Sequence, residues 1–164
     1  MADDPQAQHL SARGPLRVDH ALDLATHVDT DLPLGEWTHV TQPQIDRFVA
    51  LTNDPNWIHT DAGRMASTYN GAATIVPGQL LLSLLPGLLR DVYVVGKGRG
   101  LVAGMRAVRF RKPVHPGDDF RLHARLILVQ QNPAFVRVET ACRLQLKSGQ
   151  SAVTAQRTDI FYAD

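Results

Sequence analysis

Residues 78–91 read GQLLLSLLPGLLRD and form the most hydrophobic stretch of the chain. The segment is apolar on nearly every side of a helix, which is typical of a helix that is buried on most sides. Its longest apolar run, residues 80–89, is interrupted by Ser83, Pro86 and Gly87 and is too short to span a bilayer. We therefore expect a central buried helix, which Pro86 should kink or end early.

The sequence after this helix alternates between apolar and polar residues, as strands with one buried face do. The alternation is clear in 120–130 and 135–146, and weaker in 101–110 and 151–162. Turn residues separate these segments at 116–118 and 147–150. One buried helix followed by about four antiparallel strands predicts an α+β fold in which the sheet wraps the helix.

Upstream, residues 41–53 have the pattern of a capped amphipathic helix. Thr41 and Gln44 fit a capping box, with Thr41 as N-cap. The residues at helical spacing make one mostly apolar face: Ile45, Phe48, Val49 and Thr52.

The end of this helix carries an acid and a base five residues apart, in the stretch TNDPNWIH at 52–59. On a continuous helix Asp54 and His59 would lie about 140° apart and would not share a face. Pro55 breaks the helix and lets the two side chains converge. A carboxylate and an imidazole held together suit proton transfer. The long irregular passage predicted at 54–77 also favours a functional region.

Composition narrows the class of protein. We expect residues 1–33 to be an irregular arm and 34–164 to be one domain. A net charge of +1 with 20% charged residues gives no argument for nucleic acid. The single cysteine, Cys142, suits a strand core in a reducing compartment, and the polar N-terminus lacks a signal-peptide core. Both features lead us to expect a cytoplasmic protein. We expect no metal site, because no histidine has zinc-ligand spacing.

Four separated segments resemble the MaoC-like dehydratase family, which includes the R-specific enoyl-CoA hydratases, and the NodN-like branch in particular. That family carries a segment of the form (S/T)-G-D-x-N-P-(I/L)-H, and NodN-like members often have Trp before the Ile. The resemblance covers about residues 34–162. It is carried by GEWTHVTQ at 35–42, TNDPNWIH at 52–59, TIVPGQLLLSLLP at 74–86, and KPV at 112–114 with Gly117-Asp118.

The resemblance implies a hot-dog fold, in which a long central helix is wrapped by a curved antiparallel sheet, and pairing into a homodimer. It implies a lyase that reversibly hydrates a 2-enoyl thioester or dehydrates an (R)-3-hydroxyacyl thioester. The substrate would be carried on CoA or acyl carrier protein, in fatty acid or polyketide metabolism, with no other cofactor. Asp54 and His59 would be the catalytic residues, and the backbone N–H of Gly78 would bind the thioester oxygen. Asn56, Trp57 and Ser83 would support the site.

The chain departs from the family pattern at three positions. Asn53 replaces the Gly before the catalytic Asp, and Asn tolerates the left-handed conformation. Pro77 stands where the family has His at the helix start, and Pro86 falls at the family's serine, with Ser83 one turn earlier.

Other interpretations stay open at this stage. Taken singly, Asp54 suits a helix-end turn and His59 suits a partly buried structural histidine. Arg109, Arg111 and Lys112 are candidate contacts for the phosphates of CoA, although an exposed strand face is the commoner explanation. The alternative functions are a hot-dog acyl-thioester hydrolase and a catalytically altered acyl-CoA-binding or assembly subunit.

Overall fold

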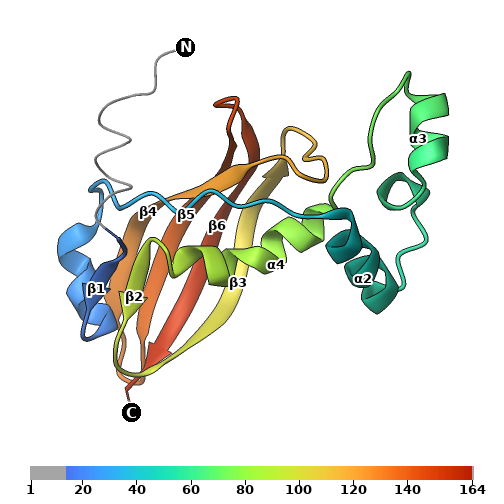
Figure 1. Cartoon of the computed structure of the whole chain (residues 1–164). Coiled ribbons are helices and arrows are strands. Elements are labelled where there is room, and N and C mark those ends of the chain that lie inside the picture. Colours follow the sequence, from blue (N-terminus) through green and yellow to red (C-terminus); the bar gives the residue numbers. More distant parts are fainter. Residues whose placement is uncertain (1–13, 164) are drawn as a thin grey trace.

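A computed structural model describes residues 14–163, and its centre is a helix lying across one face of a four-stranded antiparallel sheet (Figure 1). The helix, α4, spans Gly78–Leu89. The strands lie in the order β3-β6-β5-β4. They span Arg99–Phe110 (β3), Phe120–Gln131 (β4), Val136–Leu146 (β5) and Ser151–Tyr162 (β6). The predicted α+β fold is confirmed.

The sheet turns its apolar side chains toward α4, as the period-2 pattern predicted. Leu122, Leu126 and Leu144 are buried, whereas their polar neighbours along each strand lie on the outer face. Cys142 is also buried on the helix side and is a free thiol, as its place in the pattern predicted.

One side of α4 is open. The helix buries Leu81, Leu85, Leu88 and Leu89, at the i, i+4, i+7 and i+8 spacing of a single face. On other sides Leu80, Leu82 and Leu84 are only half-buried, and Ser83 and Pro86 are exposed. The prediction of a helix buried on most sides was therefore wrong for a single chain. The expectation that Pro86 ends the helix early was also wrong, because the helix continues three residues beyond it.

The two edges of the sheet differ. The edge of β4 is covered by the chain itself: Asp29 and Gly35 donate backbone hydrogen bonds to Leu126 and Leu122, and Thr38 bridges to Phe120. The edge of β3 has no such cover among residues 14–163, and the strand is exposed along most of its length.

Part of the predicted N-terminal arm is regular structure. Residues Leu16–Val18 form β1, which pairs in parallel with β2, Tyr93–Val95. Residues Ala21–His27 form a 3-10 helix, η1, which buries Ala21 and Leu24. The prediction of irregular structure was wrong for these residues, because η1 is fixed by tertiary contacts with β4 and β5 and not by its own periodicity. Residues 1–13 of the arm lie outside the described residues, and the domain boundary at 33/34 stays a prediction.

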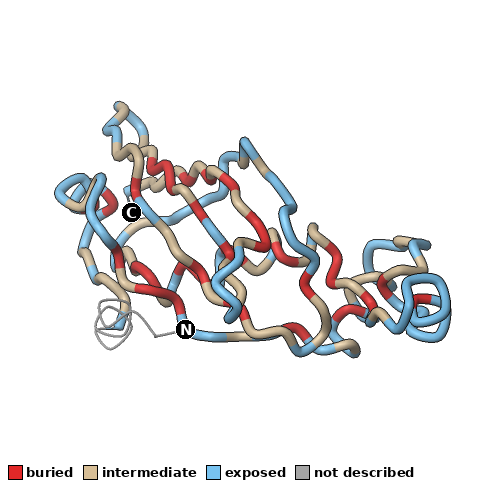
Figure 2. The backbone as a smooth tube through the Cα atoms, turned by 90° about the horizontal axis from the view of Figure 1, so that it is seen from above, coloured by how far each residue is buried: buried red, intermediate tan, exposed pale blue. Residues whose placement is uncertain are grey.

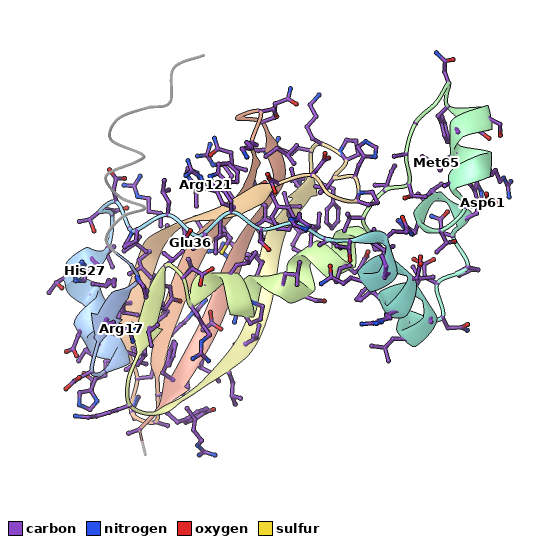
Figure 3. All side chains as sticks on the ribbon, in the orientation of Figure 1. Arg17, His27, Glu36, Asp61, Met65 and Arg121 are labelled. Carbon is purple, nitrogen blue, oxygen red and sulfur yellow. The ribbon has the colours of Figure 1, made fainter. Side chains whose placement is uncertain are left out.

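The segment between residues 41 and 77 forms a lobe that projects from one end of α4 (Figure 1). It contains α2 (Gln42–Thr52), η2 (Trp57–His59) and α3 (Ala62–Thr68). The prediction that 54–77 is irregular was therefore wrong in part, because η2 and α3 lie within it. Asp61 caps α3 by accepting a hydrogen bond from the Arg64 N–H, and Met65 is the buried residue of that helix; both are labelled in Figure 3. Figure 2 shows that the lobe has far fewer buried residues than the body of the molecule.

Candidate active site

The chain turns sharply at the end of α2. Thr41 and Gln44 form the predicted capping box at its start, and the last helical residue is Thr52. Asn53 follows in the left-handed conformation, with φ 52° and ψ 40°, which Asn tolerates better than most residues. The break therefore begins at Asn53, and Pro55 two residues later keeps the helix from resuming.

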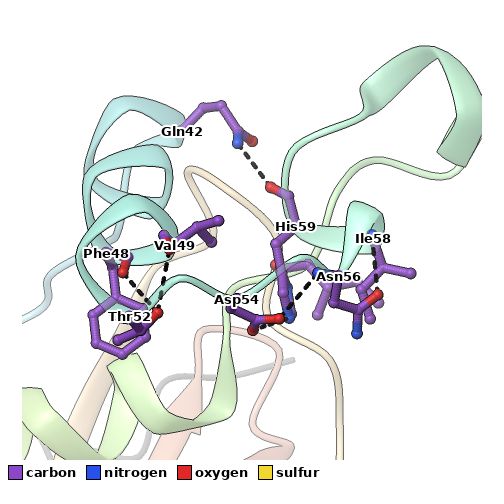
Figure 4. A network of polar contacts seen from close by, with 9 residues as sticks. Gln42, Phe48, Val49, Thr52, Asp54, Asn56, Ile58 and His59 are labelled. Carbon is purple, nitrogen blue, oxygen red and sulfur yellow. Dashed lines mark hydrogen bonds and ion pairs between the residues drawn. The ribbon is translucent and has the colours of Figure 1, made fainter.

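The turn brings Asp54 and His59 together, as the sequence predicted (Figure 4). Their facing atoms, Asp54 Oδ2 and His59 Nε2, are 3.8 Å apart. The other carboxylate oxygen of Asp54 accepts a hydrogen bond of 3.0 Å from the Asn56 N–H. The His59 side chain is 10% exposed and that of Asp54 is 35% exposed. The site thus pairs an almost buried imidazole with a carboxylate that solvent can reach.

The tautomer of neutral His59 is fixed by its second ring nitrogen. His59 Nδ1 lies 2.7 Å from the carbonyl oxygen of Ile75. A carbonyl oxygen can only accept, so Nδ1 must carry the hydrogen. In neutral His59 the Nε2 lone pair then faces the carboxylate of Asp54. Two acceptors therefore face each other across a gap too long for a direct hydrogen bond.

Residues that the sequence did not single out hold this arrangement in place. Gln42 donates to the carbonyl oxygen of His59 at 2.9 Å and accepts from the Thr74 hydroxyl at 2.6 Å. The Nδ1 of His115 lies 2.8 Å from the carbonyl oxygen of Thr74. These contacts join residues that are 16 to 41 positions apart, so no local sequence pattern predicts them. Together they connect the start of α2, the loop that carries the Asp54–His59 dyad, and residues 74–75.

Gly78 begins α4 three residues after Ile75, the partner of His59. As the first residue of the helix it has no acceptor for its N–H within α4, and the helix dipole favours negative charge at this end. A Cβ at Gly78 would lie 2.5 Å from the ring of Phe110 on β3. Only glycine fits here without a shift of the neighbouring ring.

The three supporting residues have different contacts. Asn56 caps η2 by accepting from the Ile58 N–H and braces the dyad turn. The Trp57 ring stacks on Tyr69 at 6.2 Å, with the Arg64 guanidinium 4.0 Å from its centre, so it joins η2 to α3. The Ser83 hydroxyl donates to the Gln79 carbonyl of its own helix at 2.8 Å.

The structure does not bring the three candidate phosphate contacts to the dyad. Arg109 pairs with Thr154 on the outer face of the sheet, and Arg111 donates to the Thr154 hydroxyl at 3.4 Å. Lys112 is exposed just beyond them. Within residues 14–163 there is no group of three or more His, Cys, Asp or Glu side chains placed to hold a metal ion. In the same region no helix is long and apolar enough to cross a membrane.

Comparison with known proteins places this geometry in context. The sequence model of the family described as "MaoC like domain" matches residues 23–146. 3-hydroxyacyl-thioester dehydratase Z of Mycobacterium tuberculosis is 34% identical over 109 residues, which cover 66% of this chain and 72% of that protein. Nodulation protein N of Rhizobium leguminosarum bv. viciae is 32% identical over 108 residues, 65% of this chain and 66% of that protein. The structure of the (R)-hydratase from A. caviae involved in PHA biosynthesis is similar with a TM-score of 0.64 and 26% identity, covering 77% of this chain and 94% of that one.

Proposed function

Because the chain belongs to the MaoC-like domain family, with a match over residues 23–146, we propose that it is a hydro-lyase acting on acyl thioesters. The reaction is the reversible addition of water to a 2-enoyl thioester, giving an (R)-3-hydroxyacyl thioester. Two of the similar proteins carry names that describe this chemistry, a 3-hydroxyacyl-thioester dehydratase and an (R)-hydratase. Both the fold and the reaction agree with what the sequence resemblance implied.

The observation that carries the proposal is the pair of acceptors 3.8 Å apart, Asp54 Oδ2 and His59 Nε2. A water molecule between them donates one hydrogen to each and keeps an oxygen lone pair free for attack. In hydration this oxygen bonds to C3 of the enoyl group while one of the two side chains takes a proton from the water, and that proton is then delivered to C2. Asp54 and His59 share the acid and base roles, and dehydration runs the same steps in reverse.

The thioester oxygen gathers negative charge as water adds to the enoyl group, so it needs a hydrogen-bond donor. The Gly78 N–H fits this role, because it lies at a helix N-terminus three residues from the carbonyl that orients His59. We propose CoA or acyl carrier protein as the carrier and no further cofactor, in fatty acid or polyketide metabolism. A cytoplasmic location is part of the proposal, since a single free cysteine suits a reducing compartment.

We also propose that the working form is a homodimer that meets at β3. No part of residues 14–163 covers this edge of the sheet, and Leu101 and Val102 on it are 56% and 48% exposed. The half-buried leucines of α4, Leu80, Leu82 and Leu84, add apolar surface. A second copy, adding its β3 to this edge, would complete the hydrogen bonding and cover the apolar side chains.

The test is hydration of a 2-enoyl-CoA by the full chain and by two variants, Asp54→Asn and His59→Ala. Each variant is expected to lose activity by at least about a thousandfold while circular dichroism shows an unchanged fold, because each removes one of the two water acceptors. Asp19→Asn serves as the matched control, since this mostly exposed carboxylate forms an ion pair with Lys97 and takes no part in the site. Hydration retained by both dyad variants would contradict the proposal. Release of free thiol without hydration would indicate the hydrolase instead, and binding without turnover the non-enzymatic subunit.

A further inference from the structure

A cavity of about 290 Å³ lies on the helix side of the sheet, at the C-terminal end of α4. Its walls come from α4, β2, the start of β3 and β6, and they include Pro86, Leu89, Tyr93, Val95, Arg157 and Asp159. A mostly apolar lining is ordinary for a ligand pocket. The buried charged pair on β6 is not, and the proposed addition of water at the dyad makes no use of it.

The Arg157 guanidinium is held firmly, but one of its nitrogens has no partner. Nε and Nη2 donate to the two carboxylate oxygens of Asp159, at 2.8 and 2.7 Å, and both residues are 5% exposed. The third nitrogen, Nη1, is buried and has no hydrogen-bond partner among residues 14–163. Because a buried donor without a partner costs free energy, its presence beside a cavity points to an acceptor on a ligand.

A second donor of the same cavity, the Tyr93 hydroxyl, is only weakly engaged. It lies 3.4 Å from the Thr140 hydroxyl, which is long for a hydrogen bond between two oxygens. Burial raises the pKa of Tyr93 to about 12, so this hydroxyl keeps its proton and can donate it. Thr140 is the neighbour of Arg157 in the pairing of β5 with β6, which places the phenol and the guanidinium near each other.

The cavity lies further along α4 than the Gly78 N–H, the proposed donor to the thioester oxygen. The α4 residues that line it begin at Pro86 and end at Arg90, which places them about 12 to 18 Å from Gly78 along the helix axis. Four exposed residues of α4 lie at helical spacing and form one stripe from its first turn to the cavity: Gln79, Ser83, Pro86 and Arg90. An acyl chain that follows this stripe stays on the helix side of the sheet, so pairing of β3 with a second copy does not cut across it.

We propose that this cavity selects acyl chains that carry a neutral oxygen acceptor near their far end, such as a keto group, an inference that rests on the proposed hydro-lyase function. The keto oxygen accepts hydrogen bonds from Arg157 Nη1 and from the Tyr93 hydroxyl. Both donors are then satisfied, whereas an unsubstituted alkyl chain leaves Nη1 without a partner. Arg157 and Tyr93 are therefore specificity-determining residues, remote from the dyad.

The charges around the cavity favour a neutral oxygen over a carboxylate. Asp159 already balances the charge of Arg157 through two hydrogen bonds, and a second carboxylate would be repelled by it in a buried place. Arg90, the other cation of the lining, is exposed to solvent, where its charge is screened. The span along α4 corresponds to about ten to fifteen bonds of an extended chain, since three backbone bonds advance about 3.5 Å.

Two 2-enoyl-CoA substrates of about twelve carbons test the inference on the full chain, one unsubstituted and one with a keto group next to its last carbon. Wild-type protein should prefer the keto substrate by about tenfold or more in kcat/KM, because it gains a hydrogen bond to a charged group. The double variant Arg157→Met/Asp159→Leu should lose this preference and stay folded, since a buried ion pair can be replaced by apolar residues of similar volume. The double variant Arg125→Met/Asp29→Asn removes an exposed ion pair and is the matched control, which should keep the wild-type preference.

Tyr93→Phe removes the second donor and leaves the ion pair in place, so it should lower the preference for the keto substrate even if the double variant fails to fold. A preference unchanged in Tyr93→Phe and in the double variant would overturn the inference.

Calorimetry with the saturated forms of the two CoA esters, which cannot be hydrated, separates this inference from the proposed reaction. Wild-type protein should bind the keto ester about tenfold more tightly or better, and Arg157→Met/Asp159→Leu should bind both esters alike. If the wild type discriminates in binding but hydrates neither enoyl-CoA, the cavity keeps its assignment and the proposed function fails. If it hydrates both enoyl substrates with equal kcat/KM and binds both saturated esters alike, the selection of a keto group is wrong and the hydro-lyase function stands.

Discussion

A buried charged pair lies beneath the C-terminal half of α4. Arg157 and Asp159 are each 5% exposed, and both carboxylate oxygens of Asp159 accept from the Arg157 guanidinium, at 2.8 and 2.7 Å. The phenol of Tyr93 is buried in the same region, which raises its pKa to about 12. Such a pair contributes little net stability while intact, but each partner makes the burial of the other tolerable.

Asp159→Asn should lower the free energy of unfolding by about 3 kcal/mol, because it leaves the Arg157 charge buried and unpaired. Urea denaturation would measure this. Asp19→Asn is the matched control, since it breaks an ion pair with Lys97 in which both side chains are mostly exposed, and it should cost less than about 0.5 kcal/mol. An equal effect of the two changes would contradict the prediction.

The His123 imidazole provides a residue-scale prediction for pH. Burial and the charges of Arg143 and Arg121 lower its pKa from 6.5 to about 4 in the folded protein, so between these values the unfolded state holds a proton that the folded state lacks. The contribution of His123 to the free energy of unfolding is therefore complete above about pH 6.5 and declines as the pH falls toward 4. Arg143→Ala removes one positive neighbour and should move the midpoint of the His123 titration upward, as NMR would show. A wild-type midpoint near 6.5 would rule this out.

At the scale of elements, α2 holds in place the loop that carries Asp54 and His59. Its first residue, Gln42, is bonded to the backbone of His59 and to Thr74, and also to Asp46 at 2.7 Å within the helix. The orientation of His59 thus depends on where α2 begins, and the capping box of Thr41 and Gln44 determines that position.

Gln42→Ala should lower kcat by about tenfold or more with a smaller change in KM, because displacing the His59 ring by about 1 Å misaligns the attacking water. Steady-state kinetics with an enoyl-CoA would show it. Asp46→Ala removes only the contact within the helix and should leave kcat within twofold. The role assigned to Gln42 would be wrong if the two variants behaved alike.

The elements that the sequence predicted are those with a long repeating pattern. The strands over 120–131 and 136–146 alternate because one face lies against α4, and 41–53 has a cap signal at its first turn. By contrast, η1, α3, β1 and β2 are three to seven residues long, and too short for a period to appear. They depend on tertiary contacts that only the folded chain makes.

The same distinction applies to the site. Asp54 and His59 are five residues apart with a proline between them, so their convergence could be inferred. Their partners Gln42 and Ile75 come from segments 17 and 16 residues away from His59, and nothing local connects them.

At the scale of the whole molecule, the asymmetry of the two sheet edges predicts the assembly. Light scattering at micromolar concentration should give twice the chain mass of 18.0 kDa. Val102→Lys places a charge on the open edge and should yield a monomer with reduced activity, since a charge on an edge strand opposes strand pairing. Leu51→Lys, on the lobe and 85% exposed, is the control and should remain dimeric. A wild-type monomer would count against β3 as an interface.

The projecting lobe has a consequence for how the enzyme loses activity. It carries Asp54 and His59 but few buried side chains, and it is anchored to the body by the buried side chain of Ile45 and by a backbone hydrogen bond from the Val76 N–H to the Val114 carbonyl oxygen. Regions of this kind open locally with less free energy than a sheet core. Amide hydrogens of α2 and α3 should therefore exchange with solvent well before those of β5 and β6. On warming, inactivation should precede the melting of the sheet, so that heat stability of the fold and heat stability of catalysis are separate properties of this chain.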